Sequence, residues 1–293
     1  MKRILPFILI LLSVIFTASA AEIKPLSPGD PQPFMPDEEL MKVYFFQVRA
    51  QDATLIVAGG ETMLVDAGHF ESGPYIAQYL RDLGITRIDY AVNSHPHDDH
   101  INGYISLMDE IEIGALYVCF PLDITPEMKN TVNAAKAHDI PVIEYDENTD
   151  LSFGGVSIRL YQDLVLNLYN EKNINANSMV MHVSFGDCST VLTGDISRDV
   201  HTRLAEEWGE KLKCDILKLP HHGLYTPKKI MVTTADPEIC VLTNGDNKQT
   251  NETVRFVKSW KYPIIHTPHG TIEYTANGEY WTQIQHPKAE WEE

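Results

Sequence analysis

The chain has 293 residues, 44% of them hydrophobic, and carries a formal net charge of −18 at pH 7. This negative charge opposes the binding of a polyanion at long range, so it disfavours extended nucleic acid as a partner without excluding it. The composition indicates one compact unit, because no Gly/Ser-rich or Pro-rich linker divides the middle of the chain.

The N-terminus has the pattern of a secretory signal. Two basic residues precede an apolar run from Ile4 to Phe16, and small residues follow from Ala18 to Ala20. The apolar run is too short for a comfortable membrane span. We therefore expect residues 1–20 to be a signal peptide cleaved after Ala20 or Ala21. The product would be an exported protein, periplasmic or secreted, with no stable membrane span.

The remaining chain is predicted to form one layered α/β domain. Residues 21–40 are rich in Pro and acidic side chains and indicate an extended lead-in, so the domain is expected to span 41–293. Alternating apolar segments predict strands at Val43–Val48, Thr54–Val57, Thr62–Val65, Tyr90–Asn93, Ala115–Phe120, Val156–Tyr161, Met179–Phe185, Thr190–Leu192, Ile216–Leu219 and Ile239–Leu242, and a hairpin at Thr271–Ile284. Helical periodicity predicts helices at Pro74–Leu83, Gly103–Ile111, Pro126–Ala137, Arg198–Trp208 and Thr253–Trp260.

A dense group of metal-binding side chains follows the strand predicted at Tyr90–Asn93. The sequence from His95 to His100 reads HPHDDH. On an extended or turning backbone, His95 and His97 point the same way, while Asp99 and His100 face a second point nearby. Imidazole and carboxylate are ligands that Zn²⁺, Mn²⁺ and Fe²⁺ share, so one loop can serve two divalent cations.

The spacing H-x-H-x-D-H resembles the signature of the metallo-β-lactamase-fold hydrolases. The segments Leu64–Gly68, Val191–Ser197 and Leu219–Gly223 fit the same family. With Asn175–Ser178, they look most like the soluble hydrolase domain of ComEC-type competence proteins, and secreted phosphorylcholine esterases are also similar. The resemblance implies a four-layer αββα sandwich for residues 41–293, with two metal ions at the sheet edge. Zn²⁺ is the favoured metal, with Mn²⁺ or Fe²⁺ as alternatives.

The resemblance also implies roles for individual residues. Asp66 would support the metal loop from behind, and Asp195 would bridge the two cations. Either His221 or His222 would complete the second metal site, and the sequence does not decide between them. The working ligand set is His95, His97, Asp99, His100, Asp195 and His221. Residues expected to act on the substrate are Asp99, Asp195, His222 and Tyr225, supported by Asn177 and Ser178.

One family ligand has no clear counterpart. Members with a complete first metal site have a further His before the bridging Asp, and the candidates here are His138 and His182. His138 follows a predicted helix and is most simply a solvent-facing residue. His182 lies within a predicted strand, where a structural role is more common than metal ligation. ComEC-like and phosphorylcholine-esterase-like members lack this His as well.

The ligand set favours a phosphoester or phosphodiester as substrate. Two bridged cations suit displacement at phosphorus, with a hydroxide held between them as the nucleophile. β-Lactam-hydrolysing relatives use the extra His and usually lack the bridging Asp. A small or short phosphoester is therefore the expected substrate. Two alternatives remain: a lactone or acyl (thio)ester hydrolase, and an exported module that binds metal without catalysis.

The four cysteines lack the C-x-x-C spacing of a zinc or redox site. They are Cys119, Cys188, Cys214 and Cys240, and all but Cys188 lie in apolar strand-like segments. Two disulfides are compatible with export, but we expect buried free thiols that pack as small hydrophobic side chains.

Overall fold

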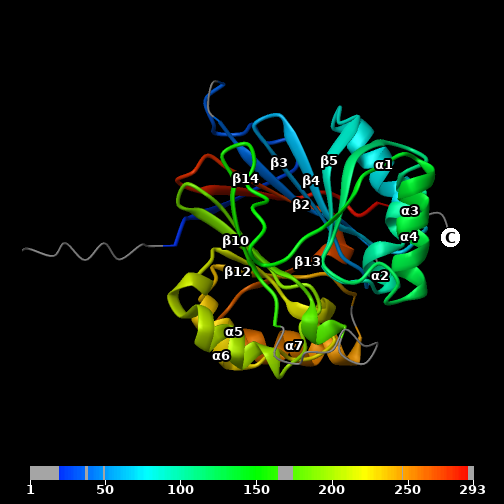
Figure 1. Ribbon diagram of the computed structural model, residues 1–293. Helices are drawn as coiled ribbons and strands as arrows, with labels where there is room; N and C mark the ends of the chain where they lie inside the picture. The colour runs from blue at the N-terminus through cyan, green and yellow to red at the C-terminus, as the bar shows by residue number, and fades with distance from the viewer. Residues whose placement is uncertain (1–19, 37–38, 49, 164–173, 246, 290–293) are drawn as a thin grey trace, which may run out of the picture.

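The computed structural model describes residues 20–36, 39–48, 50–163, 174–245 and 247–289 (Figure 1). Its strands form a nine-stranded and a six-stranded sheet. In spatial order, the first sheet contains β1 (Ile23–Leu26), β15 (Trp281–Gln285), β14 (Ile272–Ala276), β2 (Met41–Phe45), β3 (Ala53–Ala58), β4 (Glu61–Ala67), β5 (Arg87–Asn93), β6 (Glu112–Val118) and β7 (Val142–Glu144). The second contains β13 (Ile264–His266), β12 (Ile239–Leu242), β11 (Ile216–Lys218), β10 (Cys188–Leu192), β9 (Val180–Phe185) and β8 (Ser157–Tyr161).

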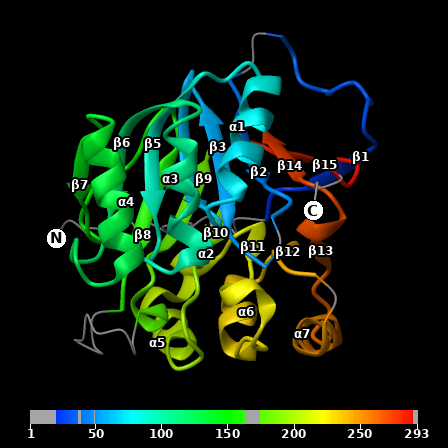
Figure 2. The same cartoon turned by 90° about the vertical axis from the view of Figure 1, so that its right-hand side faces the viewer.

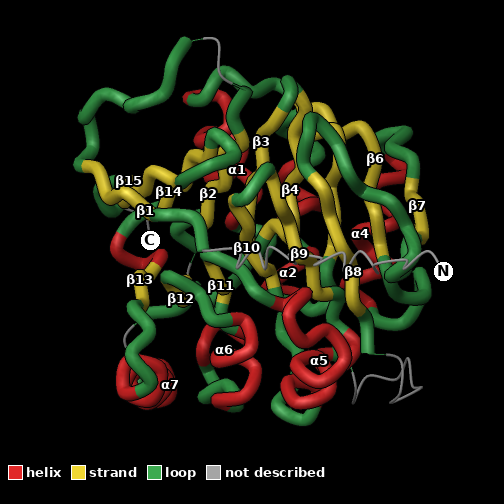
Figure 3. The backbone as a smooth tube through the Cα atoms, turned by 90° about the vertical axis from the view of Figure 1, so that its left-hand side faces the viewer, coloured by secondary structure: helices red, strands yellow, loops and turns green. Residues whose placement is uncertain are grey.

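Helices cover the outer face of each sheet. The first sheet carries α1 (Ser72–Asp82), α2 (Asp98–Ile101), α3 (Gly103–Leu107) and α4 (Pro126–Ala137). The second carries α5 (Val200–Trp208), α6 (Lys229–Ala235) and α7 (Lys248–Ser259), which form a row below the sheets in Figures 2 and 3. The predicted αββα sandwich is confirmed, because the two sheets lie between two layers of helices.

Strand alternation assigns side chains to the two cores. Along β9, Met181 and Val183 belong to the core shared by the two sheets, whereas Val180 belongs to the core beneath α5 and α6. All three side chains are fully buried. Neighbouring strand residues point to opposite faces, so both faces of this strand contribute to stability. Each such side chain contributes roughly 1.5–3 kcal/mol relative to exposure.

The topology brings the ends of strands from both sheets together. β4 and β5 are parallel in the first sheet, and β10, β11 and β12 are parallel in the second. The backbone joins the two groups directly, since Met179 N donates to Ser94 O at 3.0 Å. Residues that follow these strands therefore meet at one edge of the sandwich, as ligands do in open α/β sheets.

Several elements differ from the sequence prediction. The helix predicted to begin at Thr253 begins at Lys248, because the Asn247 side chain caps it by accepting hydrogen bonds from Gln249 N and Thr250 N. The helix predicted at Gly103–Ile111 already ends at Leu107. The short elements β1, β7, β13 and α6 were not predicted, since their sequences carry little periodicity and tertiary packing decides their structure.

The thiols agree with the sequence analysis. All four cysteines are free and buried. Burial raises the pKa of Cys119 and of Cys240 to about 12, so these thiols stay protonated. Within the described part of the chain, no helix is both long and apolar enough to cross a membrane. The signal peptide predicted for residues 1–20 lies, apart from Ala20, outside the described residues.

Candidate metal centre

Asp66, at the end of β4, fixes the loop between β5 and α2 through hydrogen bonds. Asp66 has a positive φ of 57°, an uncommon conformation for a non-glycine residue that tends to cluster at functional sites. Its Oδ1 accepts hydrogen bonds from Ser94 N at 2.8 Å and from Asn93 Nδ2 at 3.0 Å. Its Oδ2 lies 2.8 Å from His100 Nδ1. Asp66 therefore sets both the path of the loop and the direction of the His100 ring.

A first group of imidazoles forms at the start of this loop. His95 Nε2 lies 3.2 Å from His97 Nδ1 and 4.0 Å from Asp195 Oδ2. His95 is fully buried. Burial, together with the positive charge of His100, lowers the pKa of His95 well below its usual value. These two imidazoles are therefore suited to metal binding, which requires the neutral form.

A second group of donors contacts the same Asp195 carboxylate. Asp195 Oδ1 is 3.3 Å from His100 Nε2, and its Oδ2 is 3.3 Å from His222 Nε2. His222 Nε2 also lies 3.3 Å from His100 Nε2 and 3.2 Å from Asp99 Oδ2. Asp195 is thus positioned between two sets of nitrogen and oxygen donors, as a bridging carboxylate would be.

The HHG turn directs its two histidines differently. His221 and His222 both adopt left-handed conformations with φ of 51°, and Gly223 follows with φ of 70°. This turn buries His222, which is 1% exposed, within the second group. The His221 side chain is 21% exposed, with Nε2 3.6 Å from Asp195 Oδ2. The geometry therefore brings His222, rather than His221, among the donors of the second group.

Two buried charged residues complete the centre, and sequence reasoning missed both. Asp52 Oδ1 accepts a hydrogen bond from Thr243 Oγ1 at 2.6 Å and lies 3.2 Å from His222 Nδ1, while its Oδ2 pairs with Lys218 Nζ. Lys218 Nζ donates to Gly194 O at 2.9 Å and lies 3.7 Å from Asp195 Oδ1. A lysine inside the apolar strand before the HHG turn was the only sequence signal for this ion pair.

The carboxylates remain ionised despite their burial. Burial favours the neutral acid, but the imidazoles of His222 and His100 hold the pKa of Asp195 well below its usual range. Burial likewise opposes ionisation of Asp52, and the Lys218 ammonium and His222 lower its pKa. Burial opposes protonation of His222, yet Asp195 and Asp52 raise its pKa. Without a cation in the centre, protons on His100 and His222 would compensate this negative charge.

The donor set fits divalent metal ions. Asp52, His100, Asp195 and His222 each offer a donor atom within 4.8 Å of the others. Among the described residues, Asp195 Oδ1 is buried without a hydrogen-bond donor, although two cationic groups lie near it. The Asp52 oxygens already contact Thr243, Lys218 and His222, so Asp52 is better placed to orient His222 than to bind metal.

The remaining predicted site residues lie around this centre. Tyr225 is 57% exposed, and its ring packs edge-on against His221 with centroids 5.0 Å apart. Ser178 Oγ accepts a hydrogen bond from Asp195 N at 3.4 Å, so Ser178 supports the loop that carries this carboxylate. Asn177 is buried, and its carbonyl accepts from Gln162 Nε2 at 2.8 Å. The structure therefore places Tyr225 at the rim and Ser178 against the backbone of Asp195, next to the buried Asn177.

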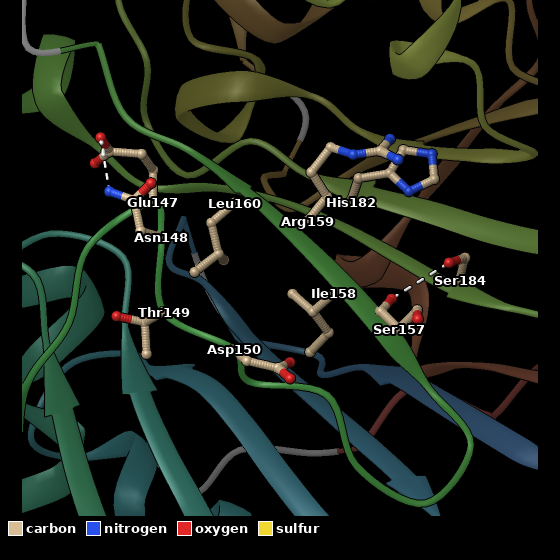
Figure 4. Close-up of a pocket in the computed structure, with 10 residues that line it drawn as sticks. All are labelled: Glu147, Asn148, Thr149, Asp150, Ser157, Ile158, Arg159, Leu160, His182 and Ser184. Carbon is tan, nitrogen blue, oxygen red and sulfur yellow. Dashed lines mark hydrogen bonds between the residues drawn. The ribbon is translucent and has the colours of Figure 1, made fainter.

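Neither candidate for the additional His joins the centre. His182 Nε2 contacts Lys213 O at 2.8 Å, and its ring packs against Trp208. His182 lines a cavity of about 390 Å³ beside β8 and β9, together with Arg159 (Figure 4). None of the proposed metal ligands lines this cavity. His138 pairs with Asp109, with 3.2 Å between Nε2 and Oδ1, at the end of α4.

Comparisons with known proteins agree with this fold. Residues 47–118 match the family model described as the metallo-beta-lactamase superfamily. CmlA, a diiron β-hydroxylase from Streptomyces venezuelae, is 15% identical with a TM-score of 0.53; the alignment covers 83% of this chain but 54% of CmlA. YhfI, a metallo-β-lactamase fold protein from Bacillus subtilis, is 12% identical with a TM-score of 0.52, covering 84% of this chain and 100% of YhfI. No curated protein matches the chain by sequence.

These comparisons support the fold that the structure shows. The chain has the metallo-β-lactamase fold, and its histidines and carboxylates gather at the sheet edge where β5 and β10 end. At these identities the structural likeness shows the fold alone.

Proposed function

We propose that this protein is an exported, dinuclear metal-dependent hydrolase that acts on a small phosphoester or phosphodiester. The observation that carries the proposal is the position of Asp195. Its carboxylate lies 4.0 Å from His95 Nε2 of the first group and 3.3 Å from both His100 Nε2 and His222 Nε2 of the second. A carboxylate shared by two donor groups suits a pair of cations and displacement at phosphorus.

The proposed ligands divide into two sets that share Asp195. His95 and His97 would hold the first ion, and Asp99, His100 and His222 the second. This proposal takes His222 as the ligand in place of His221. The bound ions would supply Lewis-acid activation of water and neutralise charge on the substrate; Zn²⁺ is favoured over Mn²⁺ or Fe²⁺.

The chain itself would position and protonate the substrate. His221 and Tyr225 lie beside each other at the exposed rim, 5.0 Å apart between ring centroids. Burial lowers the pKa of His221, although Asp195 opposes this effect, so the ring is neutral near pH 7 and can donate one N–H. Together the two side chains would donate hydrogen bonds to phosphoryl oxygens or to the leaving group.

Export and substrate class are supported by sequence features. The pattern of residues 1–20 supports cleavage of a signal peptide and release to the periplasm or medium. The net charge of −18 supports a small substrate over an extended nucleic acid. A closer kinship with ComEC-type hydrolase domains or phosphorylcholine esterases is part of the same proposal and rests on the quoted motifs. A lactone or acyl (thio)ester hydrolase is the second candidate, because the same centre suits water attack at a carbonyl.

The test is metal content and hydrolysis by the purified mature protein. We expect about two transition-metal ions per chain and hydrolysis of bis-p-nitrophenyl phosphate, as a two-metal site predicts. Asp195→Ala should lose bound metal and hydrolysis. His182→Ala should keep bound metal and hydrolysis, and it serves as the control. Activity on a lactone or thioester alone would favour the second candidate. Absence of bound metal after incubation with Zn²⁺ or Mn²⁺ would contradict the proposal.

A further inference from the structure

A buried carboxylate with three N–H donors lies where the chain enters the first sheet. Asp215 Oδ1 accepts a hydrogen bond from Ala21 N at 2.7 Å. Its Oδ2 accepts from Ser189 N at 2.7 Å and from Trp281 Nε1 at 3.0 Å. Asp215 is 2% exposed and Ala21 is 4% exposed. These contacts tie the start of the described chain to β10, β11 and β15.

This carboxylate has no cationic partner among the described residues. The nearby Lys213 pairs instead with Glu210, at 2.8 Å between Nζ and Oε2. Burial raises the pKa of Asp215, although hydrogen bonds from Trp281, Ser189 and Ala21 act in the opposite direction. A buried carboxylate without a cation is costly, so a positive charge at this point would stabilise the fold.

Ala21 is the residue that cleavage of the predicted signal peptide after Ala20 would make N-terminal. A free α-amino group has a pKa of about 7.7–8.0 and is largely protonated at pH 7. A cavity of about 160 Å³ lies at this point, and its lining includes Ala20, Lys213 and the acidic residues Asp187, Asp215 and Asp236. An ammonium on Ala21 would therefore meet carboxylates where the leader had been attached.

We propose that the Ala20–Ala21 bond is the processing site and that the new α-ammonium of Ala21 forms a buried ion pair with Asp215. Hydrolysis by a signal peptidase consumes one water, releases the leader with Ala20 as a carboxylate, and leaves Ala21 as an amine that takes up a proton. The inference rests on the export part of the proposed function and is independent of the metal chemistry.

The packing of residues 20–23 indicates the order of leader cleavage and docking of the chain into the sheet. Ala21 is buried, whereas Ala20 is exposed. The following residues enter the sheet at once, since Trp281 N donates to Glu22 O at 2.8 Å and Ile23 pairs with Trp281 in the parallel register of β1 and β15. A peptidase needs an extended, accessible chain, so cleavage precedes docking. Cleavage one residue later would remove the Asp215 partner.

The first test is the N-terminus of the protein exported by a suitable host. Intact mass and terminal sequencing should give a chain that begins at Ala21. The native α-amine should react about tenfold more slowly with an acylating reagent at pH 7 than the amine of the unfolded chain, the factor that 1.4 kcal/mol provides. A chain that begins at Glu22, or an amine that reacts equally fast in both states, would overturn the proposal.

The second test separates the effect of the positive charge on Ala21 from the effect of its N–H hydrogen bond to Asp215. A matched chain with one Gly added before Ala21 keeps an amide N–H at this position but moves the ammonium away. We expect this chain to melt at a temperature roughly 2–4 °C lower, and Asp215→Asn to cost less in it than in the chain that begins at Ala21. Equal melting temperatures for the chain that begins at Ala21 and the chain with the added Gly, both with Asp215 intact, would overturn the proposal. This comparison holds even if Asp215→Asn fails to fold. Hydrolysis is not the readout, so the outcome does not depend on the proposed activity.

Discussion

The Asp52 carboxylate lies behind His222, with its Oδ1 3.2 Å from the Nδ1 atom of that ring. Asp66 has the same relationship to His100, at 2.8 Å between Oδ2 and Nδ1. In both cases the carboxylate leaves the Nε2 atom facing the centre. Carboxylates in this position fix the tautomer and orientation of a metal-binding imidazole, so this geometry supports the proposed site for the second ion.

Replacing each histidine of the HHG turn should distinguish their roles. His222→Ala is expected to lose about one metal ion per chain, because its buried ring faces Asp99 and Asp195. His221→Ala should keep both ions and lower only kcat, because its ring lies at the rim. Metal analysis by mass spectrometry, with kinetics on the same samples, measures both effects. The reverse pattern would restore His221 as the ligand.

The buried pair of Lys218 and Asp52 should show strong coupling. Lys218→Met leaves a buried carboxylate without its cation, so we expect a loss of about 3–5 kcal/mol in the free energy of unfolding. The double variant Lys218→Met with Asp52→Asn removes both charges and should be more stable than the single variant. Urea unfolding of the wild type, the two single variants and the double variant measures this difference. Additive losses would show that the two residues act independently.

Gly103 should tolerate no larger side chain. A Cβ atom at this position would meet the backbone of Ala67 and His69, and Gly103 N donates to Gly68 O at 2.8 Å. Gly103→Ala should therefore destabilise the protein by about 1–3 kcal/mol through overpacking beside the metal loop. Gly245→Ala is the matched control, because open space surrounds Gly245. Thermal unfolding of the two variants tests the contrast, and equal losses would contradict it.

The thiols should be unreactive in the native protein. All four cysteines are buried and free, and burial raises the pKa of Cys119 to about 12. A chromogenic disulfide reagent should label no thiol at pH 8 before unfolding and all four after addition of guanidinium, since the thiolate is the reactive form. Fewer than four labelled thiols after unfolding without reductant would indicate a disulfide.

Metal removal should lower stability. An ion bound only by the folded state contributes about 2.7 kcal/mol at a free concentration of about 100 Kd. Dialysis against a chelator should therefore lower the melting temperature, and addition of Zn²⁺ should restore it. Asp195→Ala is the control, since this variant should show little response to either treatment. An unchanged melting temperature in the wild-type protein would argue against a tight metal site.

The sequence alone predicted a metal centre, because the proposed donors lie in short motifs whose geometry is local. His95 to His100 follow one strand within a single loop, and a loop of that length cannot separate its ligands widely. Strand alternation likewise predicted most of β2 to β12 and the layered fold. The layered α/β class could be predicted because repeating apolar residues report burial directly. The four-layer αββα arrangement was predicted from the resemblance to the metallo-β-lactamase-fold hydrolases.

Only the tertiary structure decided the partners that come from distant segments. Asp52 and His222 are 170 residues apart, and Asp52 and Thr243 are 191 apart, so no local pattern links them. The choice between His221 and His222 depends on two successive left-handed residues, which a motif does not encode. The hydrogen bond from Ala21 N to Asp215, 194 residues away, depends on the parallel pairing of β1 with β15. The local periodicity of apolar residues specifies helices and strands. Contacts between the two sheets exist only once the chain has packed.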